Sequence, residues 1–240
     1  MAISYPPMAA GQYIDFDKLA SLDAGAFQGR SPYPWLNEEG LLHDDAFAAL
    51  RAALPTTSCF ETRFGHERKF GQQPHDRYSL EYRDDLDVAT PWKEFVAELK
   101  GKRYREWLAN MLGTRNFKLA FHWHYTPTGC SVSPHCDAKR KLGSHIFYFN
   151  TATDWDAGWG GETVILDDGG RFSRRSNPAF SDFANATESR SIGNYSLLFR
   201  RNGNSWHGVR PLTCPEEALR KVFIVVINRL HPVLRLLPQS

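Results

Sequence analysis

The strand-like segments after residue 116 constrain the fold more than any other feature of the sequence. From Phe117 onward, short apolar segments alternate with turns, and the last of them, Val222–Ile227, contains no polar residue. A continuous apolar run of this length is typical of a strand buried on both faces. Before Phe117, the apolar residues recur with helical spacing instead. This order predicts an α+β protein, mostly β, whose working half is a sandwich or barrel of short strands.

Three helices are predicted in the first 115 residues. The first ends at Pro55, the second begins near Pro91, and the third ends at Gly113. Proline at the first helical position and glycine just past the last are common helix boundaries. We expect residues 1–240 to form a single domain, because this length suits one hydrophobic core. Within it, residues 1–115 would form a helical and loop layer packed on a β core at 116–232.

Charge and cysteine content argue against several classes of protein. The formal net charge is +2, from 29 basic and 27 acidic residues, which is too balanced to indicate a nucleic-acid or membrane-surface partner. The four cysteines contain no C-x-x-C pair, so we expect reduced thiols and neither a disulfide framework nor a structural zinc site. We find no signal peptide and no apolar run long enough to cross a bilayer. We therefore expect a cytoplasmic protein.

Two short motifs contain residue types that bind metal ions. His135 and Asp137 form an H-x-D pair after a predicted strand and turn, and His207 follows much later in the chain. Side chains at i and i+2 of an extended segment point to the same face, so this pair can bind one ion. Two imidazoles and one carboxylate bind one face of Fe(II) in many oxygenases. A second H-x-D pair, His43 and Asp45, lies at a predicted helix start, where aspartate is a capping residue, and we interpret it as structural. Spacing alone leaves a shared iron site and three unrelated roles equally open.

Several segments resemble the Fe(II)/2-oxoglutarate-dependent dioxygenases, specifically the prolyl-hydroxylase-like branch. These segments are Ser31–Trp35, the helix before Pro55, Tyr125–Asp137, Phe147–Asn150, Trp155, Gly160–Thr163, Leu197–Phe199, Trp206–Pro211 and Arg220. The resemblance implies a double-stranded β-helix, or jelly roll, with N-terminal flanking helices. It also implies Fe(II) as the metal, 2-oxoglutarate as the cosubstrate and O₂ as the oxidant. His135, Asp137 and His207 would then be the iron ligands and the catalytic residues.

The resemblance also implies which residues bind the cosubstrate. Arg220 matches the basic residue that holds the far carboxylate of 2-oxoglutarate, and a planar guanidinium that donates two hydrogen bonds suits that role. Lys221 is the alternative, because a shift of one residue in register exchanges which side chain points inward. Tyr125 and Tyr148 match positions that line the cosubstrate pocket. Either could instead be a barrel tyrosine whose hydroxyl is bonded within the core.

The resemblance implies a hydroxylase that acts on a peptide or protein side chain or on a small metabolite. One alternative is a cupin-type metal-dependent oxygenase that does not use 2-oxoglutarate, in which Arg220 would lie outside the metal pocket. Another is a non-catalytic β-sandwich binding module, which would bind no iron. In each case we expect residues 56–90 and 171–191 to shape the substrate entrance, because loops usually determine which substrate a protein binds.

Overall fold

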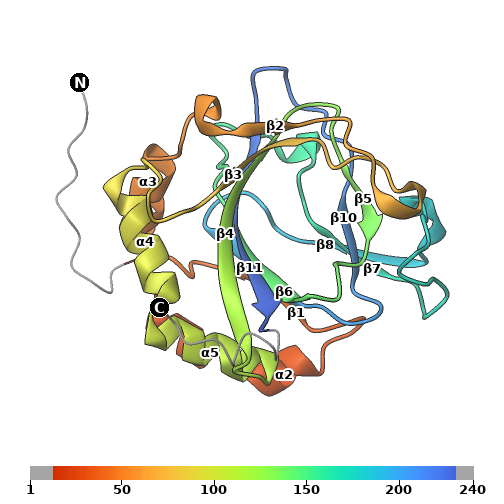
Figure 1. Ribbon diagram of the computed structural model, residues 1–240, viewed down its shortest axis with the longest axis horizontal. Coiled ribbons are helices and arrows are strands. Elements are labelled where there is room, and N and C mark those ends of the chain that lie inside the picture. Colours follow the sequence, from red (N-terminus) through yellow and green to blue (C-terminus); the bar gives the residue numbers. More distant parts are fainter. Residues whose placement is uncertain (1–12, 231–240) are drawn as a thin grey trace.

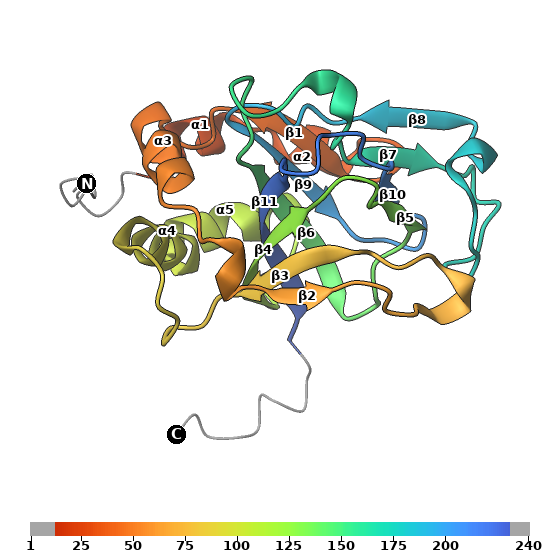
Figure 2. The ribbon, with the colours of Figure 1, turned by 90° about the horizontal axis from the view of Figure 1, so that it is seen from above.

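The computed structural model describes residues 13–230, whose strands form two antiparallel sheets that face each other (Figures 1 and 2). In spatial order, the larger sheet contains β1 (Trp35–Glu39), β9 (Tyr195–Arg200), β6 (Lys141–Tyr148), β11 (Arg220–Arg229), β4 (Phe117–Thr126), β3 (Arg77–Glu81) and β2 (Glu61–Arg63). The smaller sheet contains β5 (Val132–His135), β10 (Trp206–Val209), β7 (Val164–Asp167) and β8 (Asn185–Glu188). This arrangement confirms the predicted α+β class, mostly β, with a jelly roll.

Helices cover the outer face of the larger sheet. They are α1 (Phe16–Ser21), α2 (Ala24–Gln28), α3 (Asp44–Ala52), α4 (Thr90–Lys100) and α5 (Lys102–Leu112). Short 3₁₀ turns lie elsewhere along the chain: η1 (Thr57–Cys59), η2 (Lys69–Gly71), η3 (Ala157–Trp159) and η4 (Phe180–Asp182). The predicted boundaries of α4 and α5 hold, because Pro91 lies in the first turn of α4 and Gly113 ends α5 in the left-handed conformation. No helix in the described part of the chain is long and apolar enough to cross a membrane.

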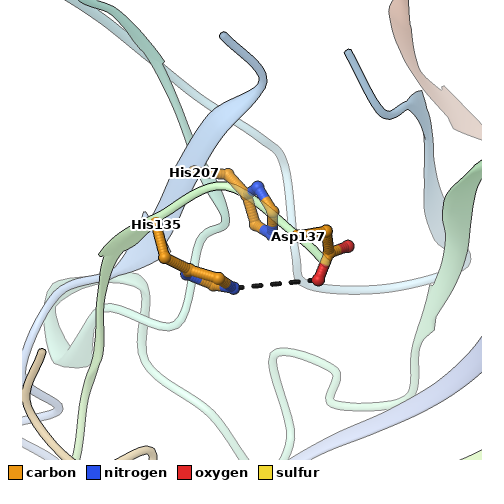
Figure 3. A group of neighbouring side chains, drawn as sticks. All are labelled: His135, Asp137 and His207. Atoms are coloured by element: carbon orange, nitrogen blue, oxygen red, sulfur yellow. Dashed lines mark ion pairs between the residues drawn. The ribbon is translucent and has the colours of Figure 1, made fainter. Parts of the chain in front are cut away.

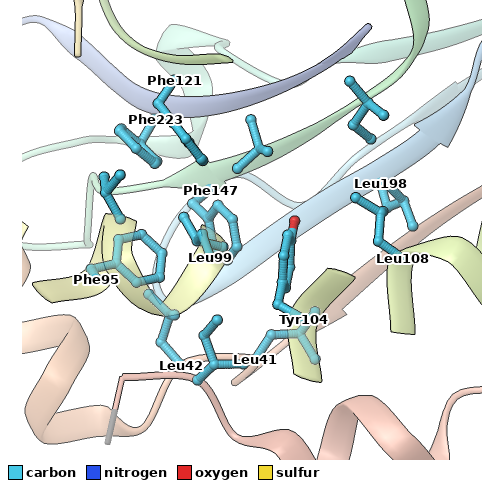
Figure 4. Close-up of a cluster of buried hydrophobic side chains, with 14 of the residues drawn as sticks. Leu41, Leu42, Phe95, Leu99, Tyr104, Leu108, Phe121, Phe147, Leu198 and Phe223 are labelled. Carbon is cyan, nitrogen blue, oxygen red and sulfur yellow. The ribbon is translucent and has the colours of Figure 1, made fainter. Parts of the chain in front are cut away.

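The main hydrophobic core lies between these helices and the larger sheet (Figure 4). Trp92 of α4 is fully buried, and its ring lies 5.0 Å from those of Trp123 and Phe223. Aromatic pairs at this separation contribute beyond the area that they bury. Because α4 and α5 supply one side of this core, the outer face of the sheet is apolar and its inner face is left for other chemistry.

Strand β4 shows how the two faces differ. Phe121, Trp123 and Tyr125 belong to the core under the helices, whereas His124 and Thr126 line a cavity on the inner face. Successive side chains of a strand point to opposite faces, so one alternating sequence serves both layers.

Three strands of the larger sheet come from the first 115 residues, which the sequence predicted to be helical or loop. β1 pairs with β9 at one edge, and the β2–β3 hairpin extends the sheet beyond β4 at the other. These strands are short and rich in charged residues, so they lack the apolar alternation that identifies a strand locally. Similarly, the segment 171–191 contains η4 and the edge strand β8 as well as loop.

Candidate metal centre

Two neighbouring strands of the smaller sheet bring the predicted metal ligands together. His135 ends β5, and it is the direct cross-strand partner of His207 on β10. Asp137 follows two residues after His135, and one ligand atom from each of the three residues lies within 4.8 Å of the others (Figure 3). All three side chains are buried. The structure therefore gathers the whole predicted triad at one point.

Hydrogen bonds orient both imidazoles in the same way. Nδ1 of His135 lies 3.0 Å from the carbonyl oxygen of Ser133, and Nδ1 of His207 lies 3.0 Å from that of Ser205. A carbonyl oxygen only accepts, so Nδ1 carries the proton and donates in each case. The lone pair of each Nε2 then points toward Asp137 and is free for a metal ion. Such outer hydrogen bonds fix the tautomer of metal-binding histidines.

The charge states of the three side chains also suit a divalent cation. Burial lowers the pKa of both His135 and His207, which favours the neutral, metal-binding form. Burial alone would raise the pKa of Asp137, but the Lys141 ammonium, 2.8 Å away, and the two histidines lower it below its usual range. Two neutral imidazoles and one carboxylate form the donor set that binds Fe(II) on one face.

Gly208 allows β10 to pack closely beside this site. A Cβ at Gly208 would lie 2.6 Å from the Val132 carbonyl oxygen of β5 and 2.8 Å from Cζ of Phe180. We expect Gly208→Ala to lower the free energy of unfolding by about 1–3 kcal/mol and to weaken Fe(II) binding, because β5 must move away from β10. Gly203→Ala is the matched control, since an added Cβ there meets nothing within 4 Å. Chemical denaturation and metal titration of both variants measure the difference, and equal losses would contradict this explanation.

A cavity of about 730 Å³ lies between the two sheets and contains the triad. His135, Asp137 and His207 line it on the side of the smaller sheet. Arg220, from the first position of β11, lines the same cavity from the larger sheet. A volume of this size is typical of a small-molecule site.

Arg220 and Lys221 point to opposite faces of β11. Arg220 is buried, its Nε donates to the Gly161 carbonyl at 2.5 Å, and no carboxylate of the described residues lies within ion-pair distance. Lys221 instead pairs with Asp154 at 3.2 Å, away from the cavity. A buried guanidinium without a counter-charge is costly unless an anion binds to it. The register thus favours Arg220 over Lys221.

The two predicted tyrosines have different positions. Tyr148 is buried next to Arg220, whose guanidinium carbon lies 5.6 Å from the ring centre. Its hydroxyl is 2.9 Å from the hydroxyls of both Thr163 and Ser189. Tyr125 lies on the outer face of β4, and its hydroxyl donates to the Pro55 carbonyl at 3.1 Å. The structure therefore places Tyr148 next to Arg220 and places Tyr125 on the opposite face of the sheet.

Other side chains in the cavity did not stand out in the sequence. His124 lines the cavity from β4. Arg68, His75 and Arg77 line it from the β2–β3 hairpin, and the ring of His75 lies 4.6 Å from that of His135. No local motif marks these residues, because only the long-range pairing of β3 with β4 places them beside the metal site. The sequence pointed to these residues only through the expectation that residues 56–90 shape the entrance to the substrate site.

Comparisons with known proteins show the fold and match part of the chain to one family. Residues 120–227 match the family model of the 2OG-Fe(II) oxygenase superfamily. No curated protein matches the chain. A prolyl-4-hydroxylase from Pseudomonas putida is similar in structure, with a TM-score of 0.62 and 17% identity over 88% of this chain and 99% of that one. A prolyl hydroxylase from Trichoplax adhaerens, solved with a peptide fragment of hypoxia inducible factor, has a TM-score of 0.63 and 11% identity over 89% and 90%.

A third similar structure has a different activity. The 2-oxoglutarate-dependent epimerase SnoN of nogalamycin biosynthesis has a TM-score of 0.59 and 13% identity, over 90% of this chain and 82% of its own. Identities this low show the fold alone, whereas the matched residues 120–227 hold the complete triad and Arg220. Residues 120–227 match the 2OG-Fe(II) oxygenase superfamily, whose chemistry uses Fe(II), 2-oxoglutarate and O₂, and the structure has the jelly-roll fold of the prolyl hydroxylases.

Proposed function

We propose that this enzyme hydroxylates an unactivated C–H bond of a peptide side chain or a small metabolite, with His135, Asp137 and His207 as its iron ligands. When bound, Fe(II) and 2-oxoglutarate together supply O₂ activation, so that one oxygen atom enters the substrate and the other enters succinate, with release of CO₂. The carboxylate of Asp137 favours hydroxylation, because the family resemblance implies that a halogenating relative has a small residue at this position.

The observation that carries this proposal is the shared cavity of the triad and Arg220. No carboxylate of the described residues forms an ion pair with the buried guanidinium, although Glu162 raises its pKa, and Arg220 lines the same cavity as the metal ligands. A dicarboxylate that binds the metal at one end and Arg220 at the other would satisfy both. The cupin-type alternative places Arg220 outside the metal pocket, so this geometry favours a 2-oxoglutarate-dependent enzyme.

The protein's own groups would orient the reactants and exclude water. The Ser133 and Ser205 carbonyl oxygens hold the two imidazoles, and Lys141 holds the carboxylate of Asp137. Gly161 holds Arg220 through its carbonyl oxygen. Rigid support of this kind keeps the ligands in place and leaves open positions on the metal for the reactants.

Anaerobic addition of Fe(II) and 2-oxoglutarate to the metal-free protein tests the proposal. We expect a weak visible charge-transfer band under anaerobic conditions and succinate after exposure to air. If the band does not form and no succinate appears, the proposed function is wrong. Iron binding without succinate would instead favour an oxygenase that does not use 2-oxoglutarate.

Replacing Tyr148 by phenylalanine separates a direct role from a supporting one. We expect Tyr148→Phe to lower the free energy of unfolding by about 1–3 kcal/mol, because the Thr163 and Ser189 hydroxyls lose a buried partner. The Kd for 2-oxoglutarate should rise less than in Arg220→Gln, since Tyr148 acts through its neighbours. Tyr125→Phe is the matched control and should leave this Kd unchanged. An effect of Tyr148→Phe as large as that of Arg220→Gln would show direct binding of the cosubstrate.

A further inference from the structure

The cavity has an excess of positive charge. Its basic side chains are Arg63, Arg68, Arg77, Arg140, Lys141 and Arg220, and its acidic ones are Glu61, Glu67 and Asp137. Glu61 already pairs with Arg63 at 2.7 Å, and Asp137 with Lys141 at 2.8 Å. One cosubstrate carboxylate at Arg220 would leave further arginines without a counter-charge. The remaining charge is concentrated on the β2–β3 hairpin.

Arg77 is the clearest of these unpaired groups. It lies directly opposite Arg63 in the β2–β3 pairing, and like charges at such positions repel each other. Its Nη1 donates to the His75 carbonyl at 2.6 Å, but its Nε is buried and has no hydrogen-bond partner. Burial lowers the pKa of Arg77 most, and the nearby Arg63 lowers it further. Within residues 13–230, no carboxylate lies within ion-pair distance of it.

Arg68 extends the same charge toward the metal site. Its Nη1 is hydrogen-bonded to Nε2 of His75, whose ring contacts that of His135. Arg68 and Arg77 line the same cavity, and burial and then Arg77 lower the pKa of Arg68, whereas Asp137 raises it. Arg68 also lacks a carboxylate partner in the described part of the chain.

A second loop holds this arm of the hairpin over the cavity. The Gln72 side chain donates to the Ser176 carbonyl at 3.2 Å, and the Asn177 side chain donates to the Gly71 carbonyl at 2.8 Å. Strand β3, which carries Arg77, lies two strands from β11, which carries Arg220. At the usual spacing between strands this is about 10 Å, so the two arginines can serve different anionic groups.

We propose that the substrate carries an oxyanion, either a carboxylate or a phosphate, which binds to Arg77 and Arg68 at the mouth of the cavity. This inference rests on the proposed function, because it assumes that Arg220 holds 2-oxoglutarate and that the reacting carbon lies at the triad. A guanidinium donates two parallel hydrogen bonds to such an oxyanion. Binding would satisfy the buried Nε of Arg77 and relieve its repulsion with Arg63.

Calorimetric titration under anaerobic conditions tests this site. The protein is saturated with Fe(II) and 2-oxoglutarate, and methyl phosphate or propionate is added in separate experiments. We expect one of the two probes to bind to the wild-type protein, and Arg77→Gln to weaken that binding at least about tenfold. Arg83→Gln is the matched control, because Arg83 is exposed, pairs with Asp85 and lies outside the cavity. Binding of methyl phosphate alone assigns a phosphate, and binding of propionate alone assigns a carboxylate.

Further measurements separate the possible failures. Arg77→Lys keeps the charge without the planar fork, and it should bind the probe between the wild-type and Arg77→Gln values. The charge-transfer band is recorded first for each protein. If wild-type protein shows the band but binds neither probe, only this inference fails. If Arg77→Gln loses affinity for 2-oxoglutarate itself, Arg77 serves the cosubstrate and the inference is overturned. If wild-type protein shows no band, the proposed function fails instead.

Discussion

Replacing His207 by alanine is expected to abolish both the charge-transfer band and succinate formation. The imidazole supplies one of three buried ligand atoms, and neither Ser205 nor Gly208 offers a side chain that could replace it. Loss of a residue that merely supports a metal ligand costs about 10–100-fold in metal affinity or activity, so loss of the ligand itself should cost at least about 100-fold. Absorption spectroscopy under anaerobic conditions and succinate quantification in air measure the two effects.

His43→Ala is the matched control for this experiment. His43 belongs to the second H-x-D pair, lies at the N-terminus of α3, and makes no capping hydrogen bond through its side chain. We therefore expect normal iron binding and normal succinate formation in this variant. Equal losses in the two variants, or full activity of His207→Ala, would contradict the assignment of the metal ligands.

Arg220→Gln is expected to raise the Kd for 2-oxoglutarate at least about 30-fold. Truncating one partner of a buried, hydrogen-bonded charge pair costs about 2–5 kcal/mol, and about 1.4 kcal/mol corresponds to a factor of ten. Lys221→Gln should change this Kd by less than about fivefold, because its partly exposed pair with Asp154 contributes about 0–1 kcal/mol. Titration of the Fe(II)-loaded protein with 2-oxoglutarate under anaerobic conditions provides both values.

Comparing Arg220→Gln with Lys221→Gln also decides which of the two residues binds the carboxylate of 2-oxoglutarate. A larger effect of Lys221→Gln would assign the cosubstrate carboxylate to lysine and contradict the register of β11 with β4. Arg220→Lys keeps the charge but loses the planar fork, and we expect an intermediate Kd.

The sequence could predict that His135 and Asp137 act together because their geometry is set locally, whereas His207 was assigned from the family resemblance and is placed by the pairing of β10 with β5. His135 and Asp137 are separated by one residue in an extended segment, so their side chains share a face whatever the rest of the fold does. The position of Arg220 relative to Lys221 depends on which face of β11 meets the cavity. The apolar run Val222–Ile227 of β11 has no alternation of polar and apolar residues that could reveal which face points inward.

Tyr125 illustrates a conflict between resemblance and alternation. The resemblance placed it in the cosubstrate pocket, yet it shares its face of β4 with Phe121 and Trp123. That apolar face packs under α4, and Phe60 covers the Tyr125 ring at a centroid distance of 4.4 Å. Strand periodicity therefore determined its environment.

The arginines of the β2–β3 hairpin could not have been predicted from sequence. A segment that contains Arg63, Arg68 and Arg77 is as typical of a solvated loop as of a cavity lining. Their role depends on pairing between β3 and β4, which are separated by two helices in the chain. Pairing over such a distance leaves no signature in either segment alone.

The different chemistry of the two faces of β4 has a consequence for how this enzyme can change. On the side packed under the helices, Trp123 is fully buried in the main core. His124 and Thr126 line the cavity on the other face instead, so their replacement changes the cavity and creates no void in the core under the helices. Mutations that alter substrate preference from these positions should therefore be tolerated by the fold. Such a division allows selection to diversify specificity while the scaffold stays constant.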